Sequence, residues 1–171
     1  MEQRTGLVTL HGNPVTLLGP ELSPGAPAPD FTLLKNDLSP AALADFKGKV
    51  IVLSVVPSLD TPVCDTQTRR FNEQAAALGG DVVTLTISVD LPFAQARWCG
   101  AAGVDRVITL SDHRDVSFGA AYGMLIDGLR LLARGVFVID KNGLIQYRQL
   151  VKEISTEPDY DAVLEAVKKL L

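Results

Sequence analysis

Three apolar runs rich in β-branched residues restrict the fold of this chain more than any other feature. They cover residues 49–56, 82–90 and 106–112, and the first, KVIVLSVV, is almost continuously apolar. A run of this kind is typical of a strand buried on both faces of a parallel sheet. A segment that can form a helix follows each run, so the alternation of strand and helix predicts an α/β fold.

The last third of the chain predicts a different connection. GVFVID at 135–140 leads through Asn142-Gly143, a strong hairpin signal, into LIQYRQLV at 144–151, so these strands should pair antiparallel. A closing helix is indicated by four residues spaced on one apolar face: Tyr160, Val163, Val167 and Leu170. A βαβ half joined to a hairpin and a final helix is the plan of a thioredoxin-like, three-layer fold with a central mixed sheet.

The N-terminal part predicts a β-hairpin ahead of this fold. Two short alternating runs in residues 7–19 flank Gly12-Asn13-Pro14, which has the composition of a turn. Residues 23–29, SPGAPAP, are too rich in proline to pair in a sheet. We therefore expect a single domain over residues 1–171, with residues 1–20 as an N-terminal hairpin extension.

Composition excludes several classes of partner. The net charge is −4, and no basic stripe is present, which argues against nucleic-acid binding. No segment approaches the roughly 18 apolar residues of a membrane helix, and the N-terminus lacks the pattern of a signal peptide. We expect a cytoplasmic protein that does not bind membranes. The reducing conditions of the cytoplasm disfavour a structural disulfide between its two cysteines.

One of these cysteines occupies an unusual position. In VPSLDTPVC, residues 56–64, an apolar strand turns polar and ends at Cys64. Thr61 fits the N-cap of a helix and Pro62 its first position, and the helix should end near Gly79-Gly80. Cys64 then lies in the first turn, where free N–H groups and the helix dipole stabilise a thiolate.

A reactive thiolate at this place could serve several reactions. A disulfide oxidoreductase would have a second cysteine three residues on, but that position is Gln67. A cysteine hydrolase would require a histidine base, and the candidates are His11, in the hairpin turn, and His113, after a strand. Their spacing forces neither histidine close to Cys64.

The spacing of Pro57, Thr61 and Cys64 resembles the Pro-x-x-x-Thr-x-x-Cys signature of the peroxiredoxins. The resemblance covers nearly the whole chain, through HGNPVTL, PSLDTPVCDTQTRRFNE, DLPFAQARWCGAAGV, LLARGVFVID and STEPDYDAVL. These segments are similar to the bacterial thiol peroxidase branch, an atypical two-cysteine group with both reacting cysteines in one subunit. The connection at 122–131 is compact for that branch, which bears on the shape of the substrate pocket.

The resemblance implies a thiol-dependent peroxidase and assigns roles to five residues. Cys64 attacks the peroxide and Cys99 closes an intramolecular disulfide with it. Thr61 and Arg134 bind the peroxide and support the reacting sulfur, and Pro57 shields the thiolate from water. The residues alone also allow Arg134 to be a surface residue, Cys99 to be a packed thiol, and Trp98 to be a core residue.

The resemblance also implies the partners. The substrate is hydrogen peroxide or an organic hydroperoxide, thioredoxin is the reductant, and the protein forms a homodimer. No metal, haem or flavin is implied. The alternative is a peroxide-sensing redox switch that uses the same cysteine pair without turnover.

Overall fold

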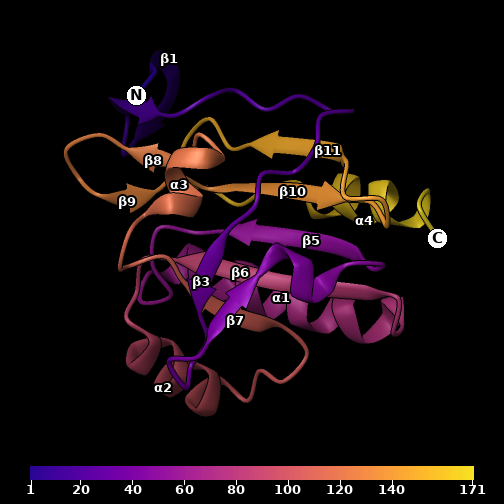
Figure 1. The fold of residues 1–171 in the computed structure, drawn as a ribbon. Coiled ribbons are helices and arrows are strands. Elements are labelled where there is room, and N and C mark those ends of the chain that lie inside the picture. The colour runs from indigo at the N-terminus through magenta and orange to yellow at the C-terminus, as the bar shows by residue number, and fades with distance from the viewer.

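The computed structural model describes residues 1–171 and contains a central seven-stranded sheet. Three neighbouring strands of this sheet are parallel and the remaining pairs are antiparallel, so the sheet is mixed as predicted. The strand order is β11 (Ile145–Leu150), β10 (Gly135–Ile139), β5 (Val50–Val55), β6 (Val82–Ser88), β7 (Ile108–Ser111), β3 (Thr32–Leu34) and β4 (Pro40–Ala42). Figure 1 shows the part of this order from β11 at the top to β7 at the bottom.

Strand β5 explains why the first apolar run carries so few polar residues. Every residue of β5 is buried. Val50 and Val52 join a cluster on one face of the sheet, whereas Leu53 and Val55 join the larger cluster on the other face. Successive side chains of a strand point to opposite faces, so a strand covered on both sides must be apolar throughout.

Helices cover both faces of the sheet and produce three layers. On one face, α1 (Pro62–Leu78) and α4 (Tyr160–Lys168) meet through Phe71 and Tyr160, whose ring centroids lie 5.3 Å apart. On the other face, α3 (Ser117–Ala121) packs into the larger cluster. Helix α2 (Pro92–Ala102) lies beside β7, and a short 3-10 helix, η1 (Leu43–Phe46), follows β4. The predicted α/β fold with a central mixed sheet is confirmed.

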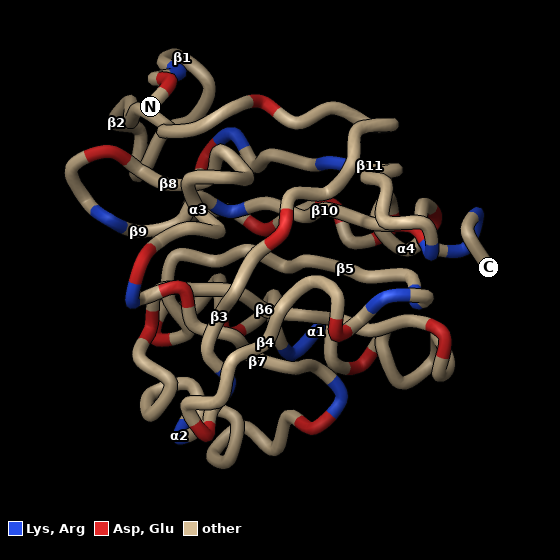
Figure 2. The backbone as a smooth tube through the Cα atoms, viewed as in Figure 1, with Lys and Arg blue, Asp and Glu red and all other residues tan.

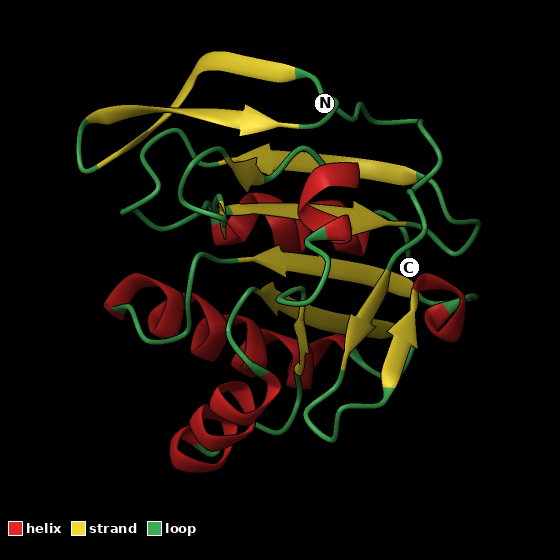
Figure 3. Cartoon of the chain, turned by 60° about the vertical axis from the view of Figure 1, so that its left-hand side comes forward, coloured by secondary structure: helices red, strands yellow, loops and turns green.

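A second, four-stranded antiparallel sheet contains the N-terminal hairpin, at the top of Figure 3. Its order is β1 (Gln3–Leu10), β2 (Asn13–Leu18), β8 (Leu125–Ile126) and β9 (Leu131–Leu132). The hairpin was expected from the sequence, whereas its pairing with the compact 122–131 connection was not.

The predicted position of the hairpin turn is wrong by one residue. The turn consists of His11 and Gly12, with φ of 50° and 80°, and Pro14 already belongs to β2. Two residues with positive φ form the turn that suits the twist of a hairpin. Pro14 pairs with Thr9 one position beyond the closing pair, where its missing N–H faces away from β1.

Residues 23–29 form no strand of either sheet, as expected, but they hydrogen-bond with the turn before β11 and its first residue. Gly25 N–H donates to Ile145 O at 2.7 Å, and Ala28 N–H donates to Gly143 O at 2.9 Å. The residues between the prolines supply these donors, so the proline content limits the pairing without preventing it.

The helices and the charges add two further observations. None of the helices is both long enough and apolar enough to cross a membrane. Acidic and basic residues are interspersed along the backbone in Figure 2, with no extended segment of basic residues.

Candidate active site

Cys64 lies where the sequence placed it, in the first turn of the helix that follows the central strand β5. Pro62 is the first residue of α1, and Gly79, with φ of 86°, ends the helix as predicted. The Cys64 side chain is fully buried and packs with Val56 and Leu59. The thiol is therefore shielded from bulk water at the positive end of a 17-residue helix.

Thr61 occupies the N-cap position, but its side chain makes no capping hydrogen bond. The hydroxyl instead donates to the carbonyl of Ser58 at 3.0 Å, within the turn that precedes the helix. The predicted cap is thus right in position and wrong in its hydrogen bond. Thr61 makes no hydrogen bond with Cys64, and its exposed side chain lines a cavity beside Pro57 and Arg134.

Arg134 comes directly before β10 and is buried, with only 2% of its surface exposed. Its Nη2 donates to Cys64 Sγ at 3.2 Å, and its Nε donates to the carbonyl of Ile154 at 2.7 Å. It forms no ion pair with a carboxylate. A buried guanidinium requires a compensating charge, and the Cys64 thiolate can supply it. The alternative of an ordinary surface arginine is excluded.

Gln67 also belongs to the site. From the sequence, this position indicated only that the second cysteine of a disulfide oxidoreductase is missing. Its Oε1 accepts from Arg134 Nη1 at 2.9 Å, and its Nε2 donates to Ser54 Oγ at 2.8 Å. The side chain is fully buried. Gln67 therefore fixes the orientation of the guanidinium that reaches Cys64. The available signal was its position three residues after Cys64, on the same face of the helix.

A cavity of about 430 Å³ opens beside this group. Its walls come from the hairpin tip, the first residues of α1 and the loop after β11, and most are apolar. They are Leu10, His11, Pro57, Thr61, Pro62, Val63, Leu131, Arg134, Ile154 and Ser155. The cavity thus joins an apolar surface to the one guanidinium that contacts Cys64. Leu131 belongs to the compact connection, which borders the site as expected.

Glu153 holds the hairpin tip against this cavity. Its carboxylate accepts from the Ser155 hydroxyl and backbone, from Gly12 N–H at 2.7 Å and from Thr9 Oγ1 at 3.0 Å. These hydrogen bonds, with the Ser155 hydroxyl contributing most, lower the pKa of Glu153 to about 2. The carboxylate is therefore ionised across the neutral range and anchors His11 at the cavity wall. His11 makes no hydrogen bond with Cys64.

Cys99 is placed away from Cys64 in this structure. It lies within α2, which continues to Ala102. The half-buried thiol contacts Thr109 Oγ1 at 3.5 Å and lines another cavity, next to Lys35 and Asp37. Thr109 donates its own hydrogen to Asn36 Oδ1, so Cys99 is the donor in its contact with Thr109. Both cysteines are free.

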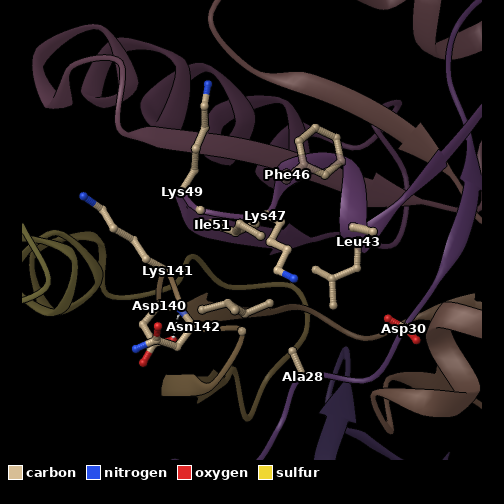
Figure 4. Close-up of a pocket in the computed structure, with 14 residues that line it drawn as sticks. Ala28, Asp30, Leu43, Phe46, Lys47, Lys49, Ile51, Asp140, Lys141 and Asn142 are labelled. Atoms are coloured by element: carbon tan, nitrogen blue, oxygen red, sulfur yellow. Dashed lines mark hydrogen bonds between the residues drawn. The ribbon is translucent and has the colours of Figure 1, made fainter.

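A separate pocket of about 270 Å³ lies near the turn between β10 and β11. Figure 4 shows Lys49 and Lys141 directed away from its centre. The Asp140 carboxylate accepts from the backbone of its own turn, at Asn142 and Leu144. The pocket contains no cysteine or histidine, so it offers no nucleophile comparable to Cys64. No group of three or more side chains in the chain is arranged as a metal site.

Comparison with known proteins agrees with this geometry. The profile of the Redoxin family matches residues 23–164. Thiol peroxidase of Bacillus subtilis (strain 168) is 60% identical over 164 residues, which cover 96% of this chain and 98% of that protein. Thiol peroxidase of Halalkalibacterium halodurans is 59% identical with the same coverage.

A solved structure extends the similarity to the fold. The peroxiredoxin-like protein from Aquifex aeolicus superposes with a TM-score of 0.91 at 45% identity, and the match covers 100% of both chains. The resemblance inferred from the Pro57, Thr61 and Cys64 pattern is confirmed. The chain belongs to the Redoxin family, within its thiol peroxidase branch.

Proposed function

We propose that this protein is a thiol-dependent peroxidase in which Cys64 reduces hydrogen peroxide or an organic hydroperoxide. The observation that carries the proposal is the hydrogen bond from the buried Arg134 guanidinium to Cys64 Sγ, at 3.2 Å. It lies at the wall of a cavity large enough for a small hydroperoxide. The apolar walls around this polar centre also suit the alkyl group of an organic substrate.

The reaction begins when the Cys64 thiolate attacks one peroxide oxygen. An S–O bond forms while the O–O bond breaks, and its electron pair leaves on the second oxygen, which takes a proton to become water or an alcohol. Cys64 is oxidised to sulfenic acid. Arg134 stabilises the thiolate and the charge that develops on the leaving oxygen, while the Thr61 hydroxyl, at the cavity, binds the peroxide. Pro57 is buried and limits access of water.

The second step is the attack of the Cys99 thiol on the sulfenic acid, which forms an intramolecular disulfide and releases water. A disulfide requires Cα atoms within about 7 Å. The Cys99 thiol lines one cavity, whereas Cys64 is fully buried and contacts Arg134, which lines another. We therefore propose that the start of α1 and the region of α2 around Cys99 unwind locally. Hydrogen exchange in both segments should then rise on oxidation.

The resemblance supports three further assignments. Thioredoxin is the proposed reductant, which restores both thiols by exchange and is itself oxidised to a disulfide. A cytoplasmic location fits a chain whose two cysteines are both free. A homodimer fits the large exposed side chains of Leu91, just before α2, and Phe93, the second residue of α2. Light scattering would test the dimer, and a monomer at micromolar concentration would contradict it.

Steady-state peroxide consumption coupled to a thioredoxin system tests the proposed function. The parent protein should turn over many times, and Cys64→Ser should be inactive. A protein that is oxidised once and then stops would instead be the redox switch. His11→Ala should keep the peroxidase activity, because Arg134 and not a histidine contacts Cys64. Replacement of both His11 and His113 by alanine without loss of activity would remove the cysteine hydrolase, which requires a histidine base.

A further inference from the structure

The two residues that adjoin the cysteines bind each other. Asp65 follows Cys64 in the first turn of α1, and Trp98 precedes Cys99 in α2. The indole Nε1 of Trp98 donates to Asp65 Oδ1 at 2.8 Å. This hydrogen bond therefore connects the two helical segments that carry Cys64 and Cys99.

Arg69 supports this connection from the next turn of α1. Its Nε donates to Asp65 Oδ2 at 2.8 Å, so both carboxylate oxygens are engaged. Its guanidinium carbon lies 5.7 Å from the centroid of the Trp98 ring, within the range of a cation–π contact. Its Nη1 also reaches the carbonyl of Ala102 in α2 at 3.4 Å. The three side chains form one network between the helices.

Trp98 also occupies the face of α2 that Cys99 would need. The Trp98 ring packs against the buried cluster of Val56, Leu59 and Cys64. Neighbouring residues of an α-helix are rotated by about 100° from each other, so Cys99 is turned away from that cluster. Its thiol accordingly contacts Thr109 on β7. Cys99 can approach Cys64 only after Trp98 has left its position.

We propose that Asp65 and Trp98 form a clasp that keeps α1 and α2 in the peroxide-reactive arrangement and sets the rate at which Cys99 reaches oxidised Cys64. The inference rests on the proposed function, because it concerns the step in which sulfenic acid and thiol become a disulfide and water. Asp65 and Trp98 are positioning residues in this step, since they act by holding the two cysteine segments. The strength of the clasp thus determines how long the sulfenic acid persists.

The test compares disulfide formation in the parent, Trp98→Phe and Asp65→Asn after one equivalent of hydrogen peroxide. Rapid quenching followed by mass analysis gives the rate for each protein. Both variants should form the Cys64–Cys99 disulfide about tenfold faster. Trp98→Phe removes the indole donor, and Asp65→Asn removes the negative charge and the acceptor for Arg69, so each change weakens the network and eases the opening. At high peroxide, both should also accumulate less overoxidised Cys64 than the parent.

Arg97→Gln is the matched control, because Arg97 is an exposed neighbour of Trp98 in α2 and forms no ion pair. It should form the disulfide at the parental rate. In the parent and in Asp65→Asn, emission of the single tryptophan should shift to longer wavelength as the disulfide forms.

Equal rates in all four proteins, or unchanged emission during disulfide formation, would overturn the clasp while leaving the proposed function intact. Should Trp98→Phe fail to fold, the comparison of Asp65→Asn with the parent decides by itself. Absence of the disulfide from the parent would overturn the proposed function and the clasp together.

Discussion

At the scale of single residues, the site depends on a buried cation whose orientation is fixed on three sides. The Arg134 guanidinium donates to the Ile154 carbonyl, the Gln67 amide and the Cys64 sulfur. Two of these acceptors are neutral, so the sulfur is the one that can carry the opposite charge. Burial makes this interaction strong, because few water molecules screen it.

Replacement of Arg134 by lysine tests the guanidinium directly. Lysine keeps the positive charge, but its three donors share one nitrogen and cannot replace the planar guanidinium, which reaches three acceptors from three nitrogens. Arg134→Lys should lower the second-order rate of Cys64 oxidation by about 100-fold, a loss typical of removing a donor to developing charge. Stopped-flow mixing with peroxide measures this rate, and thermal unfolding shows whether the fold survives. An unchanged rate would mean that Arg134 has no role in the peroxide step.

Replacement of Gln67 tests whether the Arg134 guanidinium needs its hydrogen bond to this side chain. Gln67→Met keeps the volume and removes the acceptor, so Arg134 loses one of its three hydrogen bonds. The peroxide rate should fall roughly tenfold, in line with one hydrogen bond to a charged group. Gln74→Met, on the same helix without a contact to Arg134, is the control and should react like the parent. If both variants react equally fast, Gln67 does not position Arg134.

Sequence reasoning identified Cys64 and its helix start from local signals, because proline and the strand before it mark that turn. It missed Gln67, because the spacing of three residues from Cys64 indicates a shared helix face but not that the partner of Gln67 is Arg134. Arg134 is 70 residues from Cys64 in the chain, and only the family resemblance brought the two together.

At the scale of elements, the short helix α3 depends on a buried carboxylate at its start. Asp112 follows β7 and accepts from the backbone of Phe118 at 3.2 Å and of Gly119 at 2.8 Å. Its exposure is only 3%. Burial outweighs these hydrogen bonds and raises the pKa of Asp112 from 3.8 to about 6. The Asp112 carboxyl thus orients α3, but its burial lowers the stability of the fold, and this loss increases when the carboxyl ionises.

The raised pKa of Asp112 predicts a pH-dependent stability. The folded protein holds the Asp112 proton more tightly than the unfolded chain, so the stabilisation is complete below pH 3.8 and is lost as the pH rises through 6. Between pH 4 and 7, the unfolding free energy of the parent should fall by on the order of 2 kcal/mol relative to Asp112→Asn. Denaturant unfolding of both proteins measures the difference. A difference that does not vary with pH would contradict the assignment.

The elements also show which parts of the fold a sequence pattern does not predict. The long strands and helices were predicted because each one repeats its pattern over several residues. The β8–β9 pair has two residues in each strand and gains its structure from contact with β2. Gly19 illustrates the same dependence, because a Cβ there would lie 2.0 Å from the carbonyl oxygen of Ala120. The requirement for glycine at this position arises only where the N-terminal hairpin packs against α3.

At the scale of the whole molecule, the two cysteines lie in separate surroundings while their helices touch. Cys64 is buried and contacts Arg134, which lines the cavity at the hairpin tip, whereas Cys99 lies near β7 beside Thr109. This separation means that peroxide reduction and disulfide formation require different arrangements of one chain. In the proposed cycle, the described arrangement performs the first step and opens for the second.

One measurement tests this cycle most directly: the mass and the cysteine linkage of the protein after one equivalent of peroxide. The parent should lose two hydrogen atoms and yield a peptide that joins Cys64 to Cys99 within one chain. Cys99→Ser should gain one oxygen atom, held on Cys64 as sulfenic acid. A disulfide-linked pair of chains, or a Cys99→Ser protein that turns over with thioredoxin as fast as the parent, would contradict the proposed cycle.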